Sequence, residues 1–190
     1  LRGRVNGRLM TPLLLTGGIL SVPRINPVGE AGPLGLQTTA ADAAIKLSGG
    51  ALAYTGEGET PDRALELYGG GSGTLIHNGT GPLLITNALA VTATGNKTLT
   101  LRGTAKDGSF SGSITNGTSA VISVTKSDTG AWLLSGNNTF SGTLAVNMGT
   151  LAIAGTNAQG AGAISIANAA NSNAIMRITE GATVSGTGAF

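Results

Sequence analysis

Four carboxylates between residues 57 and 66 form the densest group of side chains that could do acid–base chemistry. They are Glu57, Glu59, Asp62 and Glu66, with Arg63 among them. A glycosidase or lyase needs carboxylates, together with Arg, Lys or Ca²⁺, on one exposed face. The segment TGEGETPD is rich in turn residues, so we predict a protruding solvated loop, with Asp62, Arg63 and Glu66 as a local ion-pair cluster. We assign no catalytic residue and predict that the chain is not an enzyme.

The residue types do not favour metal or cofactor chemistry. His77 is the single histidine and there is no cysteine, so the usual zinc sites cannot form. The segment GGGSGTL lacks the aspartate of the Ca²⁺-binding repeat G-G-x-G-x-D, and no phosphate loop, dinucleotide fingerprint or G-x-S-x-G motif occurs. We predict no metal and no cofactor, and we place His77 at an outward or edge-facing position of a strand.

Sugar or ice binding would require a row of aromatic or hydroxyl side chains along one face. Trp132 shares its parity with Leu134, which favours a core position over a sugar-stacking one. Thr-x-Thr pairs stand at 92–94 and 98–100, and an ice-binding solenoid would need such threonines in a flat outward ladder. The aromatic residues considered for a sugar-binding row are Tyr54, Tyr68, Phe110, Trp132 and Phe140.

The composition indicates a thin aliphatic core. Of the 190 residues, 32 are glycine, 11% are charged and 3% are aromatic, so a globular core built around large rings is excluded. A solenoid, in which each rung buries a few aliphatic residues against its neighbours, fits these values. The net charge is +2 and the aromatic residues are not interleaved with basic ones, which argues against a nucleic-acid platform. No apolar run approaches the length of a membrane-spanning helix.

Short segments of period-two alternation recur at close intervals along the whole chain and predict an all-β protein. Hairpins of a sandwich or barrel could give this spacing, but small residues at the corners and the lack of helical periodicity favour a β-solenoid. We predict eight or nine rungs of about 20 residues. The segment TLTLR, with Leu99 and Leu101 on one face, is the clearest strand, and residues 103–119 are predicted to be a polar loop.

Residues 127–155, SDTGAWLLSGNNTFSGTLAVNMGTLAIAG, are the most informative stretch. The pieces Trp132–Leu134, Leu144–Val146 and Leu151–Ile153 alternate at period two. Between them stand SGNNTFSG and NMG, whose Gly, Asn and Ser residues are typical of turns. The stretch therefore predicts strand, turn, strand, tight turn and strand.

The same stretch resembles the autotransporter-associated β-strand repeat, most closely at Leu134–Phe140 and Gly149–Leu151. It departs from that pattern where Thr129-Gly130-Ala131 replaces a second glycine. The resemblance implies a right-handed parallel β-helix on a secreted or surface-anchored bacterial protein, with motif residues that are structural. The residues it assigns to the structural repeat are Trp132, Leu134, Gly136, Asn137, Asn138, Thr139, Phe140, Gly142, Gly149, Leu151 and Ile153.

An internal repeat links the two ends of the chain at an offset of about 131 residues. Residues 11–54 resemble residues 142–185, beginning with TPLLLTGGILSV against GTLAVNMGTLAI. The collinearity over about 40 residues indicates repetition of one structural unit. We therefore predict a single β-solenoid domain over residues 1–190.

Two functional hypotheses follow. In the first, the chain is a structural segment of a surface β-helix that acts in adhesion or filament assembly. Self-association would occur through open strand edges, because no cap is recognisable at either end. In the alternative, the chain is a tail-spike-like β-helix that binds or cleaves carbohydrate. The expected partners are further copies or repeats and a host or surface glycan, without nucleic acid and without membrane insertion by this segment.

Overall fold

Three parallel β-sheets surround one long core in the computed structural model, which describes residues 4–5, 8–9, 11–158, 162–166, 173–179 and 181–185. The seven-stranded sheet, called the front sheet, contains β4 (Ile19–Val22), β6 (Ala51–Tyr54), β8 (Gly73–His77), β11 (Lys97–Gly103), β13 (Ile122–Lys126), β15 (Leu144–Val146) and β18 (Ile164–Ile166). The four-stranded sheet contains β3 (Leu13–Leu15), β5 (Ile45–Leu47), β7 (Leu65–Leu67) and β10 (Ala90–Val91). The five-stranded sheet contains β9 (Leu83–Ile85), β12 (Gly108–Phe110), β14 (Ala131–Leu134), β16 (Gly149–Ile153) and β19 (Ala174–Ile178).

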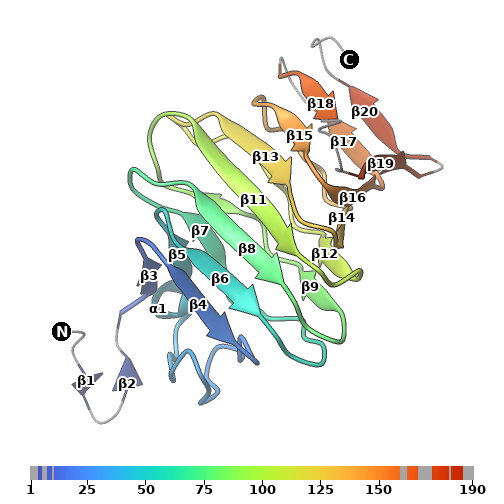
Figure 1. Cartoon of the computed structure of the whole chain (residues 1–190). Helices are drawn as coiled ribbons and strands as arrows, with labels where there is room; N and C mark the ends of the chain where they lie inside the picture. Colours follow the sequence, from blue (N-terminus) through green and yellow to red (C-terminus); the bar gives the residue numbers. More distant parts are fainter. Residues whose placement is uncertain are drawn as a thin grey trace.

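Each return of the chain to the front sheet completes one rung. Among the described strands, β7 to β9 and β10 to β12 visit all three sheets, whereas the earlier rungs have no strand in the five-stranded sheet and the later rungs have none in the four-stranded sheet. Strands of neighbouring rungs pair in parallel, as β8, β11 and β13 do in the front sheet. The rungs wind into a right-handed parallel β-helix whose axis runs from the N-terminal to the C-terminal end in Figure 1. This confirms the fold class predicted from the sequence.

The core is a column of aliphatic side chains that point inward from every rung. In β11, Leu99 and Leu101 are fully buried while Thr98 and Thr100 face outward. Val124 of the next rung pairs with Leu99 and continues the column. Removing apolar surface from water stabilises the fold by about 25 cal/mol per Å². A shift of one residue would turn these side chains outward, so their burial fixes the register.

Rung length varies along the β-helix, so the predicted length of about 20 residues fits the later described rungs but is too short for the first ones. The front sheet has seven strands among the described residues. Ile19 pairs with Ala51 in an early rung, whereas Thr125 pairs with Ala145 in a later one, and the early circuit uses much more chain. The first rungs are longer because they carry extra loops.

The predicted polar loop over residues 103–119 is wrong at its centre, where β12 forms. This strand pairs with Leu83–Ile85 of β9 on one side and with Trp132–Leu134 of β14 on the other. Gly108 and Ser109 carry little strand signal of their own, so the neighbouring rungs impose the extended conformation.

The two segments related by the internal repeat fold as strands on different sheets. Leu13–Leu15 form β3 in the four-stranded sheet, whereas Leu144–Val146 form β15 in the front sheet. The second copy extends to residue 185 and includes residues 159–161, 167–172 and 180, which lie outside the described residues. The internal repeat and the single domain over residues 1–190 therefore remain predictions.

The remaining described elements are short. β1 (Arg4–Val5) pairs with β2 (Arg8–Leu9) in antiparallel, and β17 (Thr156–Ala158) pairs with β20 (Thr183–Ser185) in parallel. The helix α1 (Ala40–Ala43) has Thr39 as its N-cap, whose side chain accepts from the backbone N–H of Asp42. Over the described ranges, no helix has the length and apolarity needed to cross a membrane.

Candidate binding site

The segment SGNNTFSG forms a corner where earlier rungs have a strand of the four-stranded sheet. Asn138 is buried, and its Oδ1 accepts from the backbone N–H of Ile114 in the preceding rung (2.8 Å). The N–H of Thr139 donates to the carbonyl of Ile114 (2.9 Å). Asn137 and the Thr139 side chain face solvent, while Phe140 returns to the core. The corner is thus stacked on the preceding rung by side-chain and backbone hydrogen bonds.

Glycines of this corner stand where neighbouring backbone leaves no room for a side chain. A Cβ at Gly136 would overlap the carbonyl oxygen of Gly112, and one at Gly142 would overlap that of Ile122. Gly149 has a φ of +72°, which favours glycine. The remaining residues of the predicted repeat, Trp132, Leu134, Leu151 and Ile153, are buried in the core.

His77 lies inside the helix, so the predicted outward position is wrong. Its side chain is fully buried, and Nε2 lies 2.9 Å from Oδ1 of Asp107. The ring lies 5.7 Å from that of Tyr54 and 6.1 Å from that of Trp132, and the second pair meets edge to face. The Trp132 indole N–H donates to the carbonyl of Arg102 (3.0 Å). His77 and Trp132 therefore pack between rungs inside the β-helix, while Tyr54 also borders a pocket at the turn that follows β6.

The five aromatic residues considered for sugar stacking do not form an exposed row. Tyr54, Phe110, Trp132 and Phe140 are buried. Tyr68 is partly exposed, with the ammonium group of Lys46 4.3 Å from its ring centroid.

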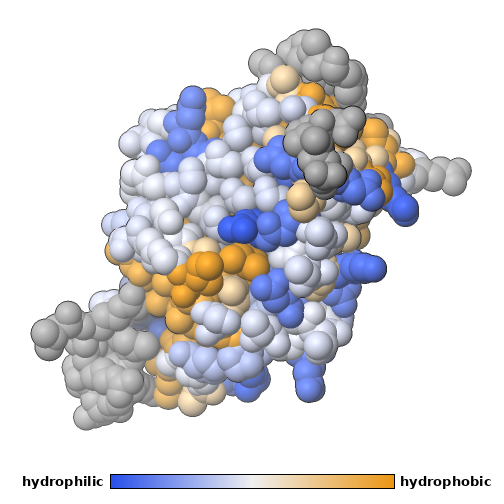
Figure 2. Space-filling model, viewed as in Figure 1, coloured by the Kyte–Doolittle hydropathy of each residue, from blue (hydrophilic) through white to orange (hydrophobic). Residues whose placement is uncertain are grey.

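Outward threonines form a short ladder on the front sheet. Thr100 pairs with Thr74 on one side and with Thr125 on the other, and all three face outward. The row continues as Ala51 and Ala145, so the threonines span three rungs. Figure 2 shows this sheet largely in pale colours, with a hydrophobic patch toward the N-terminal rungs. That end carries Ala51, Ala53 and Ile76, which form a small second hydrophobic cluster.

The most elaborate loop among the described residues lies between β4 and β5 and is called the excursion (residues 23–44). The buried side chain of Arg63 holds it in place through hydrogen bonds. Arg63 Nε donates to the Asn26 carbonyl (2.5 Å), and Nη1 donates to Gln37 Oε1 (2.7 Å). Longer bonds reach the carbonyls of Ala43 and Gly35 (both 3.3 Å). Burial lowers the pKa of Arg63, yet these acceptors satisfy the charged guanidinium.

The predicted ion-pair cluster of Asp62, Arg63 and Glu66 is therefore wrong. Asp62 Oδ1 instead accepts from the N–H of Val28 in the excursion (2.9 Å). Glu66 lies in β7, paired with Lys46 (3.5 Å) and hydrogen bonded to the Thr92 hydroxyl. The predicted solvated loop is also wrong for Glu59, whose side chain is largely buried and whose Oε2 accepts from the N–H of Ile25 (2.6 Å).

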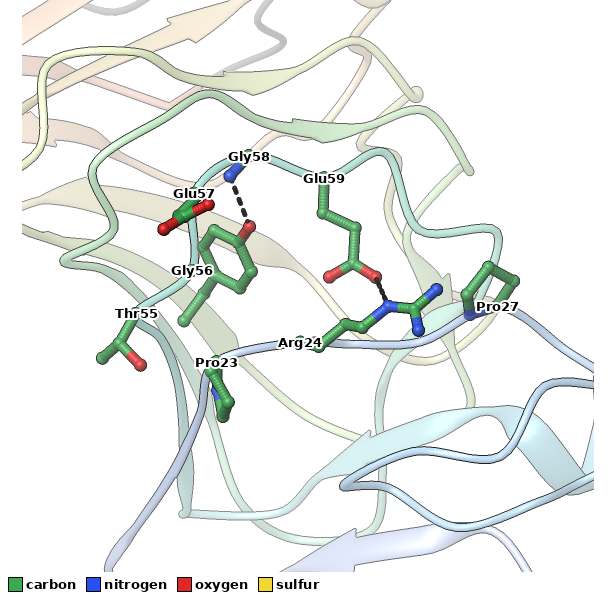
Figure 3. A pocket seen from close by; sticks show the side chains of 9 residues that line it. Pro23, Arg24, Pro27, Thr55, Gly56, Glu57, Gly58 and Glu59 are labelled. Carbon is green, nitrogen blue, oxygen red and sulfur yellow. Dashed lines mark hydrogen bonds and ion pairs between the residues drawn. The ribbon is translucent and has the colours of Figure 1, made fainter.

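A pocket of about 660 Å³ opens between the excursion and the turn that follows β6. Figure 3 shows Arg24 from the excursion and Glu59 from the turn pointing toward each other, with Pro23 and Pro27 beside Arg24. Arg24 Nε lies 3.7 Å from Glu59 Oε1, and Arg24 Nη2 donates to Glu30 Oε2 (2.6 Å). The structure thus brings Glu57 and Glu59 to one pocket and leaves Asp62 and Glu66 outside its lining.

Glu59 is the distinctive group of this pocket. Its Oε1 atom is buried and accepts no hydrogen bond, although it is ion-paired with Arg24. The Arg24 guanidinium at 3.7 Å offsets part of the cost of burying this carboxylate oxygen. Sequence reasoning found Glu59 but missed Arg24, because the two residues belong to different rungs and no local pattern joins them.

The turn that carries Glu59 is fixed by Tyr54 and by glycine geometry. The Tyr54 hydroxyl accepts from the N–H of Gly58 (2.8 Å), and Gly58 has a φ of +129°. A Cβ at Gly56 would overlap the carbonyl oxygen of Pro23. The turn that forms this wall of the pocket is therefore fixed by the Tyr54 hydroxyl and by close packing against Pro23.

The described residues offer no cluster of side chains suited to binding a metal ion. Among the residues that the structure describes, no group of three or more His, Cys, Asp or Glu side chains could hold a metal ion. The pocket offers one cation and two carboxylates beside proline rings, which is a set suited to hydrogen bonding.

Comparison with known proteins gives the family relationship. Residues 124–153, which include β14 to β16 and the SGNNTFSG corner, match the family described as passenger-associated-transport-repeat. The chain carries an autotransporter passenger repeat. It is also similar to "Adhesin BmaC autotransporter" of Brucella suis biovar 1 (strain 1330), with 37% identity over 122 residues. No solved structure matches the chain.

The passenger repeat confirms the resemblance predicted from the sequence and the predicted location, which is secreted or at the bacterial cell surface. The similar stretch covers 62% of this chain but 4% of the Brucella adhesin, so the chain spans a small part of that relative's length. The pocket around Arg24 and Glu59 lies outside the matched repeat, in the part of the chain where the rungs are longest.

Proposed function

We propose that this chain is an adhesive segment of a bacterial autotransporter passenger, in which the β-helix is a rigid stalk and its loops contact the target surface. The observation that carries the proposal is the passenger repeat lying within a continuous stack of parallel rungs. The name of the Brucella relative, an adhesin, supports the same role. Loops on a rigid scaffold are the usual place for binding residues. The corner of residues 136–142 would then serve as the structural unit that propagates the stalk.

The role we infer is binding without catalysis. Glu59 and Asp62 bond to backbone amides of the excursion, and Glu66 pairs with Lys46. Carboxylates held in this way support the loop and are poorly placed for proton transfer.

A second part of the proposal is self-association by edge pairing. The end rungs of the described helix present β4 at one end and β18 and β19 at the other, each paired on one side in its sheet. Ile19 in β4 is 64% exposed and Ile178 in β19 is 52% exposed. An open parallel edge offers unpaired N–H and C=O groups to another rung. The partner would be an adjoining rung of the same passenger or of a second copy.

Adhesion is tested by coating beads with the chain and counting their attachment to cultured epithelial cells. We expect attachment above that of beads coated with a β-helix lacking loop excursions, and competition by soluble chain. Equal attachment of the two bead types would contradict the adhesive role.

Edge pairing is tested separately by light scattering over a hundredfold dilution and by electron microscopy. Concentration-dependent oligomers or filaments are expected. Ser21→Pro in the edge strand β4 should remove them, because proline offers no N–H to a further strand. A dilution-independent monomer without filaments would refute this part alone.

The alternative of a carbohydrate-binding β-helix gains support from the pocket, whereas carbohydrate cleavage does not gain support from the arrangement of carboxylates. Release of reducing ends from a polysaccharide panel, lost on Glu57→Gln or Glu59→Gln, would favour cleavage. Binding without release would place the chain among carbohydrate-binding adhesins.

A further inference from the structure

We propose that the chain modifies itself at Asn78, where the nitrogen of Gly79 attacks the side-chain amide and ammonia is lost. The two residues form the corner that follows β8, in the sequence Asn78-Gly79-Thr80. The product is first a cyclic succinimide and then aspartate or isoaspartate. The site lies outside the matched passenger repeat, and its chemistry does not depend on the adhesive function.

Gly79 supplies an unhindered nitrogen for the ring closure. A Cβ at this position would overlap the carbonyl oxygen of Gly56, so a side chain would require the backbone of the preceding rung to shift. The Asn78 N–H donates to the Tyr54 carbonyl (2.9 Å) and the Thr80 N–H to the Gly56 carbonyl (2.8 Å), which fixes the corner on that rung. A residue without a side chain lets its nitrogen approach the Cγ atom of the asparagine before it.

His77 provides a base for the Gly79 N–H. This N–H donates to Nδ1 of the imidazole (3.3 Å), so Nδ1 carries a lone pair. Nε2 then carries the ring proton and donates it to Oδ1 of Asp107 (2.9 Å). The carboxylate orients the ring and would stabilise the imidazolium that forms when Nδ1 takes a proton. An amide nitrogen attacks poorly until its proton is removed, so this arrangement favours attack.

Thr104 of the next rung polarises the carbonyl that is attacked. Asn78 Oδ1 accepts from the backbone N–H of Thr104 (3.0 Å) and from its hydroxyl (3.4 Å). Negative charge develops on this oxygen when the nitrogen adds to Cγ, and donors already aimed at it lower the barrier. Asn78 and Thr104 are both exposed, so water reaches the ring once it has formed.

The reaction requires no reactant other than water. Gly79 N bonds to Asn78 Cγ while His77 Nδ1 takes the proton of that nitrogen. The bond between Cγ and Nδ2 then breaks, its electron pair leaves with Nδ2, and His77 returns the proton, so ammonia departs. Water opens the ring at Cγ, which gives aspartate, or at the main-chain carbonyl carbon of residue 78, which gives isoaspartate. The sum is the exchange of an amide and water for an acid and ammonia, without oxidation or reduction.

Conversion would loosen the corner in which it occurs. Isoaspartate adds a methylene group to the main chain between the N–H groups of residues 78 and 80. Those N–H groups bond to the carbonyls of Tyr54 and Gly56 in the preceding rung, and a longer chain no longer matches their spacing. The rung would therefore open more readily at this corner as the protein ages.

A second Asn-Gly-Thr sequence, at residues 116–118, offers a control within the same chain. The Gly117 N–H donates to a main-chain carbonyl (3.0 Å), which is too weak a base to take its proton. Asn116 Oδ1 accepts from two backbone N–H groups (2.9 and 3.2 Å), so its carbonyl is also polarised. Its amide nitrogen, the leaving group, is held by the Ser141 hydroxyl (2.7 Å). The local sequence is thus the same at the two sites, and the imidazole is present only at Asn78.

The test follows the freshly purified full chain at neutral pH for several weeks in heavy-oxygen water, by mass spectrometry of its peptides. Loss of ammonia reports the succinimide, uptake of heavy oxygen reports its hydrolysis, and electron-transfer fragmentation distinguishes isoaspartate from aspartate. In the folded chain, Asn78 should convert at least about tenfold faster than Asn116. In urea the two rates should agree within about threefold, because the unfolded chain has no fixed imidazole. Equal rates in the folded chain, no conversion at Asn78, or a tenfold difference that persists in urea would overturn the proposal.

Variants separate catalysis from support, because the two roles predict effects of opposite sign. An Asn-Gly corner that is merely loosened converts faster, whereas one that loses its base or its oxygen donor converts more slowly. His77→Gln should slow conversion at Asn78 by at least about tenfold. Thr104→Val should slow it by about two- to tenfold, the equivalent of one neutral hydrogen bond. Asn116 is the internal reference and should keep its rate in both variants.

Two exposed positions decide the question if circular dichroism shows that His77→Gln does not fold. Thr104→Val is one of them. Asp107→Asn is the other, since the Asp107 side chain is 45% exposed and its substitution removes the charge that stabilises the imidazolium. It should slow conversion at Asn78 by about two- to tenfold. Unchanged or faster conversion in the folded variants would overturn the proposal.

Discussion

Replacing Arg63 with methionine should release the β4–β5 excursion while the β-helix stays folded. Methionine keeps much of the volume of the buried stem but donates no hydrogen bond. The carbonyls of Asn26, Ala43 and Gly35 and the Gln37 amide oxygen would lose their donor. Those four acceptors span the whole excursion, so their loss acts on this loop first.

The size of the effect follows from the bond lengths. Two of the bonds are short, at 2.5 and 2.7 Å, and two are long, at 3.3 Å. A hydrogen bond to a charged group contributes about 1.5–3 kcal/mol, so the two short bonds alone give about 3–6 kcal/mol. The excursion forms no strand of the three main sheets, and the energy is therefore lost by local opening. At 1.4 kcal/mol per tenfold change, the opening equilibrium should rise by about 10²- to 10⁴-fold.

Native-state hydrogen exchange measures that opening residue by residue. The amides of Ile25, Val28 and Leu34 donate to side chains that hold the excursion, and their exchange should accelerate by at least about a hundredfold. The amides of β11 in the front sheet should keep their rates. Arg102→Met is the control, because its partly exposed pair with Asp128 contributes at most about 1 kcal/mol. Equal acceleration in β11 and the excursion, or none in the excursion, would refute the role given to Arg63.

Three further predictions concern the rungs. Lys126 is fully buried, its ammonium donating to the carbonyls of Ser127, Asp128 and Met148, and burial lowers its pKa to about 8. The unfolded chain then binds more protons above pH 8, so the free energy of unfolding should rise by up to about 2 kcal/mol between pH 8 and 9.5. Above pH 10 the raised pKa of Tyr54 acts in the opposite direction. Urea midpoints that stay flat or fall from pH 8 to 9.5 would contradict this assignment. Gly103→Ala should cost about 2–3 kcal/mol, since φ is +113° and a Cβ would overlap the His77 carbonyl, whereas Gly70→Ala, with open space around it, should stay within about 0.5 kcal/mol. Asn138→Ala should cost about 1–3 kcal/mol by thermal unfolding through loss of the bond to Ile114, and exposed Asn137→Ala should cost little; equal losses would argue against the buried corner bond.

The sequence predicts the strands well where each carries its own inward residues. Leu99 and Leu101 alternate with threonines, and β11 forms around them as predicted. β12 was missed because its extended conformation comes from β9 and β14, which belong to the rungs before and after it. No window of local sequence contains those partners, so propensity at Gly108 and Ser109 could not indicate a strand.

The burial of single polar residues also escapes local reasoning. Arg63 stands among carboxylates in sequence, yet its partners Asn26 and Gln37 belong to the preceding rung. The candidate pocket joins Arg24 and Glu59 for the same reason. His77 is different, because it shares its period-two parity with buried Leu75 in β8, and this local signal for an inward position was overlooked. The contacts of Arg63 and of the Arg24–Glu59 pair join different rungs. Local sequence predicts the strands of one rung but does not predict which residues of two rungs come into contact.

Variation in rung length indicates where the function of such a helix resides. The rungs of the passenger repeat are short, as the pairing of Thr125 with Ala145 and of Ala145 with Ser165 shows, and this length suffices for core residues and corners. The rung from Ile19 to Ala51 is much longer, and the excess forms the excursion that Arg63 fastens. Ordering one residue costs about 1–2 kcal/mol of conformational entropy, so an excursion that adds little to the core persists only where its own contacts offset that cost. Here those contacts are buried hydrogen bonds that hold a pocket open. The long rungs of a passenger, rather than its regular repeats, are therefore where binding sites should be sought.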